Sequence, residues 1–208
     1  GIFNHSGGTN TTGSLQLGNT GNGAYFLSGG TLAVTGPITI GTQGGTGNLF
    51  IANVTATAAS VTNSNGDISL AGANDSNSAG DLTITGDYTQ CATAELDVGI
   101  GGANAGTEYS VVAVGGNATL DGTLGIDLEN GFTSPFGQTF EIIDAGSLTG
   151  TFSKVNSPYQ LEMDYTSTGL FITFVPEPSG IGLLALAAGL LLRRRRPNTI
   201  LSHSIRSI

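Results

Sequence analysis

Short runs of alternating apolar and polar residues recur through the first 90 residues. Leu15–Leu17 recurs as Ile38–Ile40, and each run places its two apolar side chains on one face of a strand. Ile68–Leu70 and Leu82–Ile84 repeat the pattern at irregular spacing. The pattern predicts short strands, each with one buried face and one exposed face.

A second repeat is centred on phenylalanine. Phe3, Phe26 and Phe50 occur at nearly equal intervals, and the step from Phe3 to Phe26 equals the step from Leu15 to Ile38. Residues 3–9 align with residues 26–31 and more loosely with residues 50–55. A period in the twenties is typical of a stacked solenoid, in which each turn buries its apolar side against its neighbours. Glycine pairs are expected to supply the positive φ that the corners need, at Gly7-Gly8, Gly29-Gly30 and Gly44-Gly45.

From Ala94 the alternating runs become longer and glycine pairs become fewer. Leu161, Met163 and Tyr165 alternate with acidic residues, and one wet face with one dry face predicts an antiparallel sheet. The predicted strands are 95–98, 109–114, 123–128, 140–143, 161–165 and 170–175. The core of this region is expected to contain Phe132, Phe136, Phe140 and Phe152.

An apolar run near the C-terminus ends in four consecutive arginines. The segment 179–192 would span about 21 Å as a helix, against a hydrocarbon thickness of about 30 Å. That length favours a buried core helix, but four adjacent cations cannot be packed into a core, so we expect a membrane helix. Basic residues that flank a membrane helix stay in the cytoplasm. The part of the chain before the helix, called the body here, is therefore expected on the outer side of the membrane. The apolar residues are Ile181, Leu183, Leu184, Leu186, Leu190, Leu191 and Leu192, and the basic stop is Arg193, Arg194, Arg195 and Arg196.

Pro176, Glu177 and Pro178 precede this run, and the order of tripeptide, apolar helix and arginine cluster resembles the PEP-CTERM sorting signal of exported bacterial proteins. The resemblance implies processing by an exosortase-type enzyme near the tripeptide, and transfer of the preceding part to the envelope or extracellular matrix. Such signals usually stop at the basic cluster, whereas this chain continues from Pro197 to Ile208.

The glycine- and threonine-rich repeats of residues 1–72 resemble the autotransporter-associated β-strand repeats of bacterial surface proteins. The stretch from Gly106 to Phe152 is similar to the terminal β module that often follows them, which implies a role as a cap. Because the repeat is already under way at Gly1 and no charged-then-apolar leader follows, we expect further turns and a signal peptide upstream.

Charge is distributed very unevenly. Residues 1–178 carry one lysine against 15 acidic residues, a net charge of −14, and the other five basic residues follow the tripeptide. Such a body repels phosphates, so the sequence argues against a nucleic-acid partner. A hydrophobic content of 38% also argues against disorder, although 34 residues are glycine.

Few residues suggest metal or cofactor chemistry. Cys91 is the only cysteine, and we interpret it as a small strand residue. The only histidines that could serve as its base are His5 and His203. Residues 44–51 approach a calcium-binding nonapeptide, but Leu49 stands where the ligand aspartate belongs. Residues 99–106 have glycines at dinucleotide-loop intervals without a following helix. The aspartates near turns are expected to be solvated rather than calcium-binding: Asp67, Asp75, Asp81 and Asp87. No cofactor or metal is predicted.

Enzyme and ice-binding functions have weaker support in the sequence. With fifteen acidic residues a chance pair of facing carboxylates is expected on number alone, so they do not indicate a glycosidase. A polysaccharide lyase is disfavoured because Lys154 is the only base in the body. Threonine alternation at residues 55–57 and 83–85 suggests an ice-binding face, but the spacing in the sequence does not repeat across three turns.

The sequence therefore predicts an all-β chain with a β-solenoid region (1–90), an antiparallel or β-helix-like cap module (91–175) and a sorting signal with one membrane helix and a basic tail (176–208). We expect a non-enzymatic protein of the bacterial cell surface or matrix, held in the inner membrane before processing. Its expected partners are an exosortase-type enzyme, the membrane and an exopolysaccharide. The alternative is a carbohydrate-binding or carbohydrate-degrading β-helix whose active turns lie in missing N-terminal sequence. An exposed aromatic strip beside clustered carboxylates would favour this alternative, and a uniform Thr/Asn/Ser surface would favour the structural role.

Overall fold

The computed structural model describes residues 1–70, 79–133 and 136–176. Within these ranges the chain forms strands and turns, which confirms the all-β solenoid. Gly1–Val175 form one compact unit, and Pro176–Ile208 form a second. The predicted membrane helix and arginine cluster, together with Glu177 and Pro178, lie outside the described residues.

The strands follow one another with short connections. Their bounds are β1 (Ile2–Thr12), β2 (Leu15–Leu17), β3 (Asn22–Ile40), β4 (Thr46–Ile51), β5 (Thr55–Asn63), β6 (Gly66–Ser69), β7 (Asp81–Ile84), β8 (Tyr88–Gln90), β9 (Glu95–Ile100), β10 (Val112–Leu120), β11 (Thr123–Leu128), β12 (Thr139–Gly150), β13 (Lys154–Asn156), β14 (Leu161–Tyr165) and β15 (Gly169–Phe174).

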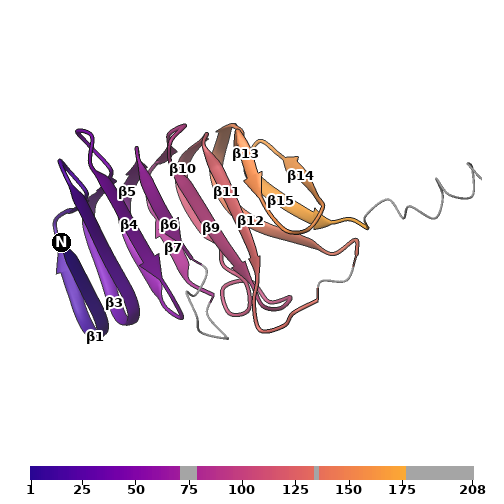
Figure 1. Ribbon diagram of the computed structural model, residues 1–208, viewed down its shortest axis with the longest axis horizontal. Coiled ribbons are helices and arrows are strands. Elements are labelled where there is room, and N and C mark those ends of the chain that lie inside the picture. The colour runs from indigo at the N-terminus through magenta and orange to yellow at the C-terminus, as the bar shows by residue number, and fades with distance from the viewer. Residues whose placement is uncertain (71–78, 134–135, 177–208) are drawn as a thin grey trace, which may run out of the picture. The chain divides into compact units, whose positions relative to one another are not determined.

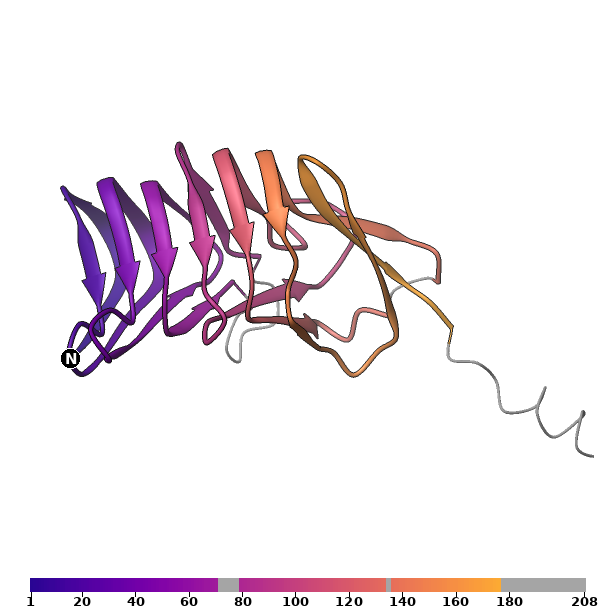
Figure 2. The ribbon, with the colours of Figure 1, turned by 90° about the horizontal axis from the view of Figure 1, so that it is seen from above.

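Each turn of the solenoid passes through three parallel sheets, and the long strands bend from one sheet into the next. The first face contains residues 2–5 and 22–27 with β4, β6, β9, β11 and β13. The second face contains residues 9–12, 31–34, 55–58, β7, 112–114 and 143–145. The third face contains β2, residues 37–40, 60–63, β8, 117–120 and 147–150. Figure 1 shows the strands of the first face in order along the molecule, and Figure 2 shows the stacked turns from above.

The core is built of columns in which one residue per turn points inward. One such column runs through Tyr25, Leu49, Ile68, Leu96 and Leu124, all buried. Because alternate residues of each strand point to opposite sides, the same strands expose polar residues on the outside. Burying one column along many turns lets each turn stabilise its neighbours, although no single turn encloses a core of its own.

The register confirms most of the predicted repeat. Leu15 pairs with Ile38 as predicted, and Phe26 pairs with Phe50. Phe3, however, pairs with Tyr25 and not with Phe26, so its predicted alignment is wrong by one residue. A bulge between His5 and Ser6 changes the offset, and a one-residue shift turns a side chain to the opposite face of a sheet.

The antiparallel sheet predicted from Ala94 onward is wrong for most of that region, whereas the β-helix-like alternative for residues 91–175 agrees with the strand pairing. β9 pairs with β11, and β10 pairs with β12, in parallel. Among the described strands, β15 pairs antiparallel with both β14 and β12, and an isolated antiparallel bridge joins Ile100 and Tyr109. A solenoid face has water on its outside and core on its inside, so a parallel strand there shows the same alternation as an antiparallel strand.

Several smaller expectations concern single residues. Phe140 and Phe152 are buried and Phe132 is partly buried, but Phe136 is 68% exposed, so its assignment to the core is wrong. Cys91 follows β8 instead of lying in a strand, and it is a free cysteine. Each predicted glycine pair contains one glycine with positive φ, at Gly8, Gly30 and Gly44.

Among the residues that the structure describes, no helix is long and apolar enough to cross a membrane. This statement does not extend to residues 177–208, where the membrane helix was predicted.

Candidate functional site

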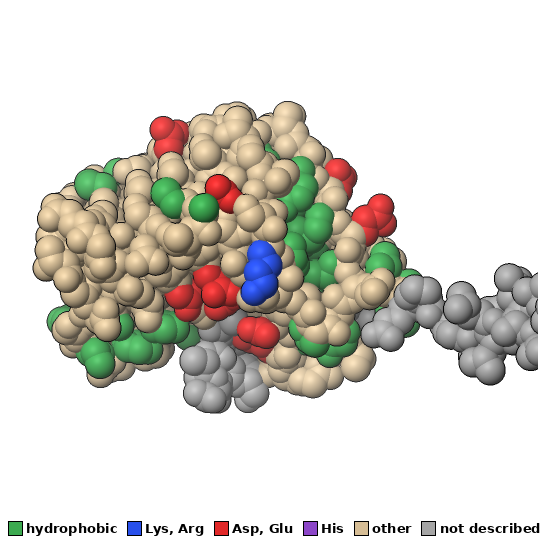
Figure 3. Space-filling view, turned by 45° about the horizontal axis from the view of Figure 1, so that its top comes forward, with side chains coloured by type: hydrophobic (Ala, Val, Ile, Leu, Met, Phe, Trp, Pro, Cys, Tyr) green, Lys and Arg blue, Asp and Glu red, His purple; other side chains and the backbone are tan. Residues whose placement is uncertain are grey.

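The outer side of the first face carries a cluster of acidic residues. The register places Asp67 beside Glu95, and Asp97 lies two residues further along β9. Asp127 belongs to the adjacent β11. Figure 3 shows acidic side chains gathered beside the lysine of the body, which is Lys154 on β13. We refer to Asp67, Glu95, Asp97 and Asp127 as the acidic cluster.

Two carboxyl groups of the cluster are hydrogen-bonded to each other. Desolvation, followed by repulsion from Asp97 and Glu95, raises the pKa of Asp67 from 3.8 to about 7. Desolvation and repulsion from Glu95 and Asp127 raise the pKa of Asp97 to about 6. The bond raises the pKa of Asp67 and opposes the rise at Asp97, so Asp67 keeps the proton and donates it to the Asp97 carboxylate. Asp67 Oδ1 is buried without a hydrogen-bond partner among the described residues.

Glycine makes room for these side chains. A Cβ at Gly125, on the turn after Asp97, would overlap Oδ1 of Asp97. At Gly99 a Cβ would come within 2.5 Å of Oε1 of Glu129. Acidic side chains thus lie over glycines of neighbouring turns, and a larger residue at either glycine would have to displace a carboxylate.

A polar ladder lies inside the solenoid behind this face. The Tyr88 hydroxyl donates to Oε1 of Gln90 over 2.6 Å, and both side chains are buried. Gln90 in turn donates to the carbonyls of Ala94 and Thr123 at 3.3 and 2.9 Å. Asn63, one turn earlier, donates to the Glu95 carbonyl at 3.1 Å. These amides satisfy backbone groups where the chain turns back into the first face, so their role is structural.

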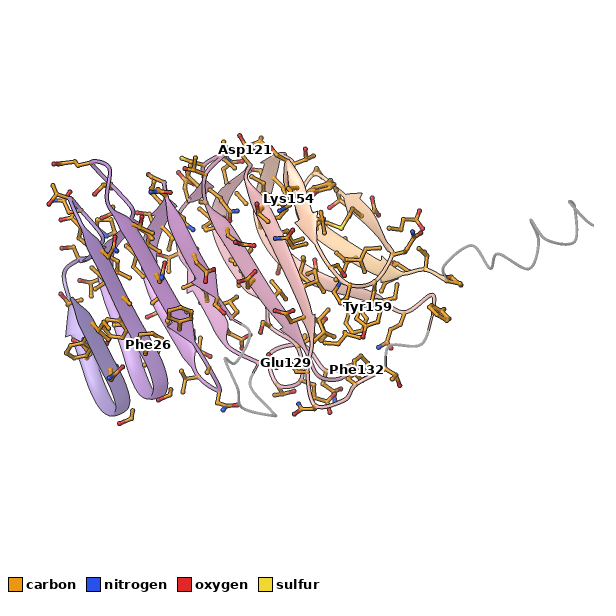
Figure 4. All side chains as sticks on the ribbon, in the orientation of Figure 1. Phe26, Asp121, Glu129, Phe132, Lys154 and Tyr159 are labelled. Carbon is orange, nitrogen blue, oxygen red and sulfur yellow. The ribbon has the colours of Figure 1, made fainter. Side chains whose placement is uncertain are left out.

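An aromatic pair lies on the same face, beside the cluster. The rings of Phe26 and Phe50 stack with centroids 4.5 Å apart and an interplanar angle of 5°. The next residue in that outward column is Ser69, followed by Asp97. Because the two rings cover each other, only their edges and outer faces are open to a ligand. Figure 4 shows Phe26 on this face, with Glu129 and Phe132 further along the solenoid.

The hydrogen-bonded pair Asp67–Asp97 does not have the carboxyl spacing of a glycosidase. Glycoside hydrolysis requires two carboxyl groups about 5 to 9.5 Å apart, whereas Asp67 and Asp97 are in direct hydrogen-bond contact. No set of three or more His, Cys, Asp or Glu side chains is arranged to hold a metal ion in the described ranges. The arrangement can store a proton between two turns of the solenoid.

The other residues singled out from the sequence lie apart from this cluster. Leu49, in the calcium-like motif, is a buried core residue. His5 is buried, with Nδ1 2.9 Å from the Tyr25 hydroxyl. Asp81 and Asp87 accept backbone hydrogen bonds from Val111 and Asn117.

The expectation of solvated aspartates is wrong for Asp67, which lies within β6 and is largely desolvated. Its partner, Asp97, was not identified from the sequence, because their contact depends on how two turns align. Asp75, Glu177 and Pro178 lie outside the described residues, and Pro176 is exposed after β15.

Comparisons with known proteins give no family assignment. No protein-family model matches the sequence, and no curated protein matches it at a significant level.

Proposed function

We propose that this chain is a non-enzymatic protein of the bacterial surface or extracellular matrix, in which the solenoid is the exported body. One observation carries the proposal: the body is a continuous ladder of parallel strands whose second and third faces are covered mainly by Thr, Ser, Asn and Gly. A repetitive rod with a small, polar surface suits a structural role, because each turn adds length and repeats the same kind of surface.

A hollow of about 600 Å³ near Gly1 is lined by the first turns, with Ile2, Leu15 and Tyr25 among the lining residues. None of these described lining residues has an acidic or basic side chain. At the other end, β14 and β15 turn antiparallel across β12, and we assign them the role of a cap that protects the last parallel strands.

Sorting through the C-terminal signal completes the proposal. Pro176, Glu177 and Pro178 act as the recognition site for an exosortase-type enzyme, the apolar run 181–192 as a membrane helix, and Arg193–Arg196 as its cytoplasmic stop. The end of the compact unit at Val175 supports this reading, because processing after that point leaves the strands intact. The inner membrane is the expected location before processing, and the envelope, surface or matrix is the location after it.

The test replaces Glu177 by Ala in a host with an exosortase system. Wild-type protein is expected as a shortened form outside the inner membrane, and the Glu177→Ala variant as an uncleaved membrane-held form. Asp164→Asn, which changes an exposed acidic residue of β14, is the matched control and should mature normally. Unchanged maturation of Glu177→Ala would refute the sorting role.

Carbohydrate binding is the second candidate, favoured by the Phe26–Phe50 pair beside the acidic cluster. An exopolysaccharide would contact the outer ring faces and the neighbouring polar groups. Pull-down with insoluble neutral polysaccharide tests it: Phe50→Ala should lose retention and Phe136→Ala, at an exposed position elsewhere, should keep it. Equal retention of both variants would reject this candidate.

A further inference from the structure

The second face carries a two-dimensional array of threonines. One outward column contains Thr9, Thr31 and Thr55 on successive turns. The adjacent column contains Thr11, Ala33, Thr57 and Thr83. We refer to these residues as the threonine array. The expectation that threonine spacing does not repeat across three turns is therefore wrong. The turns differ in length, so threonines that align in the structure are not evenly spaced in the sequence.

The hydroxyl groups of the array are available to a ligand. Those of Thr9, Thr11, Thr31, Thr55, Thr57 and Thr83 make no hydrogen bond within the described part of the chain. Thr35 and Thr85, at the border of the array, instead bond to backbone carbonyls of the preceding turn. The array also lacks charge, and the first acidic residue in its columns is Asp81 on β7.

Backbone pairing fixes the spacing of these groups. Neighbouring strands lie about 4.8 Å apart, and alternate residues of one strand lie about 6.7 Å apart. Each threonine is β-branched, so its χ1 is restricted and its methyl and hydroxyl groups are held in place. The interior residues between them, Leu32, Ala56 and Leu82, are fully buried and anchor the sheet from below.

The spacing between neighbouring strands is close to a spacing found in ordered water. Waters joined tetrahedrally by hydrogen bonds of about 2.75 Å place second neighbours about 4.5 Å apart, near the strand spacing of about 4.8 Å. The difference accumulates to only about 1 Å across four strands. A glycan is a poorer match, because the array offers no aromatic ring and no amide, and an anionic polymer would meet the Asp81 carboxylate beside it.

We propose that the threonine array binds the surface of ice. Hydroxyl groups join the water lattice while the methyl groups between them order the adjacent waters, and many weak contacts act together because one rigid sheet presents them all. The activity is separate from the sorting signal and from the acidic cluster, which lies on the first face.

The proposal is tested by measuring the growth of ice crystals during recrystallisation in the presence of the full chain. An amphipathic polymer keeps the chain in solution, and the polymer alone serves as the blank. Wild-type protein should slow crystal growth, and Thr57→Tyr should lose that effect because a large ring interrupts the array. Thr62→Tyr is the matched control: Thr62 lies in the same strand, β5, and points outward on the third face. It should keep the wild-type effect.

A further variant separates surface chemistry from folding. Thr57→Ser keeps the hydroxyl and removes the methyl group, so it should slow growth less than wild type, and thermal unfolding should show all variants folded. The proposal is overturned if wild-type protein leaves ice growth unchanged, or if Thr57→Tyr and Thr62→Tyr lose the effect equally.

Discussion

The carboxyl group of Asp97 lies over Gly125 on the next turn, in the space that a Cβ would occupy. The absence of a side chain at Gly125 is therefore part of the acidic cluster, because it allows Asp97 to reach Asp67. Sequence position does not reveal this relationship, since the two paired residues belong to different strands, β9 and β11, with all of β10 between them in the chain.

Gly125→Ala should destabilise the body by about 1 to 3 kcal/mol, because the new Cβ forces the Asp97 carboxylate out of its place. Urea unfolding followed by circular dichroism measures the loss. Gly7→Ala is the control, as a Cβ there meets nothing within 4 Å. If the two variants have equal stability, Gly125 is not needed for the packing of Asp97.

Stability should fall as pH rises from about 5 to about 8. Asp67 and Asp97 have pKa values of about 7 and about 6 in the folded protein, both above the ordinary 3.8, so the folded state binds more protons than the unfolded chain in this range. Their contribution is complete below the unfolded pKa and is lost as pH rises through the folded values. After allowance for partial solvent exposure the loss is about 1 to 3 kcal/mol.

The pH experiment needs a variant that removes the titration. Asp67→Asn should flatten the pH dependence of the urea midpoint, whereas Glu162→Gln, at an exposed position of β14, should leave it as in wild type. The proton assigned to Asp67 would be contradicted if the urea midpoint of the wild-type protein rises from about pH 5 to about pH 8 and the Asp67→Asn variant shows the same pH dependence.

Leu96→Ala should cost about 2 to 5 kcal/mol, because Leu96 is fully buried in the column that joins successive turns. Val155 occupies the last position of the same column but is 38% exposed. Val155→Ala should therefore cost clearly less. Chemical denaturation compares them, and a larger loss at Val155 would place the stabilising core elsewhere.

Tyr88→Phe should cost about 1 to 3 kcal/mol, since it leaves Oε1 of the buried Gln90 without its donor. Tyr159→Phe removes a hydroxyl from a half-exposed ring and should be near neutral. Thermal unfolding distinguishes the two, and equal midpoints would show that the buried bond contributes nothing net.

The solenoid and much of its register can be predicted from the sequence, because alternation and the spacing from Leu15 to Ile38 both reflect one strand per turn on each face. The alignment of Phe3 cannot, because a bulge between His5 and Ser6 changes the offset by one residue. The direction of the strands after Ala94 cannot be predicted either, since alternation shows which side of a strand faces water and not the direction of its neighbour.

The sequence does not reveal the acidic cluster, and it shows the threonine array only as separate pairs of threonines, for a common reason. The interval from Thr57 to Thr83 is longer than the interval from Thr9 to Thr31, so no single period aligns the paired threonines. Asp67 and Asp97 meet only after the turns between them have taken their places. Contacts between turns depend on loop lengths that alternation does not encode.

The central claim, that the solenoid is exported and released through its C-terminal signal, is tested most directly by fractionating cells that express the chain and weighing the recovered protein by intact mass spectrometry. The account predicts a polypeptide outside the inner membrane that contains the strands through β15 and ends near the Pro176–Pro178 tripeptide. Recovery of the intact chain, with its C-terminal arginines, as a soluble cytosolic protein would contradict it.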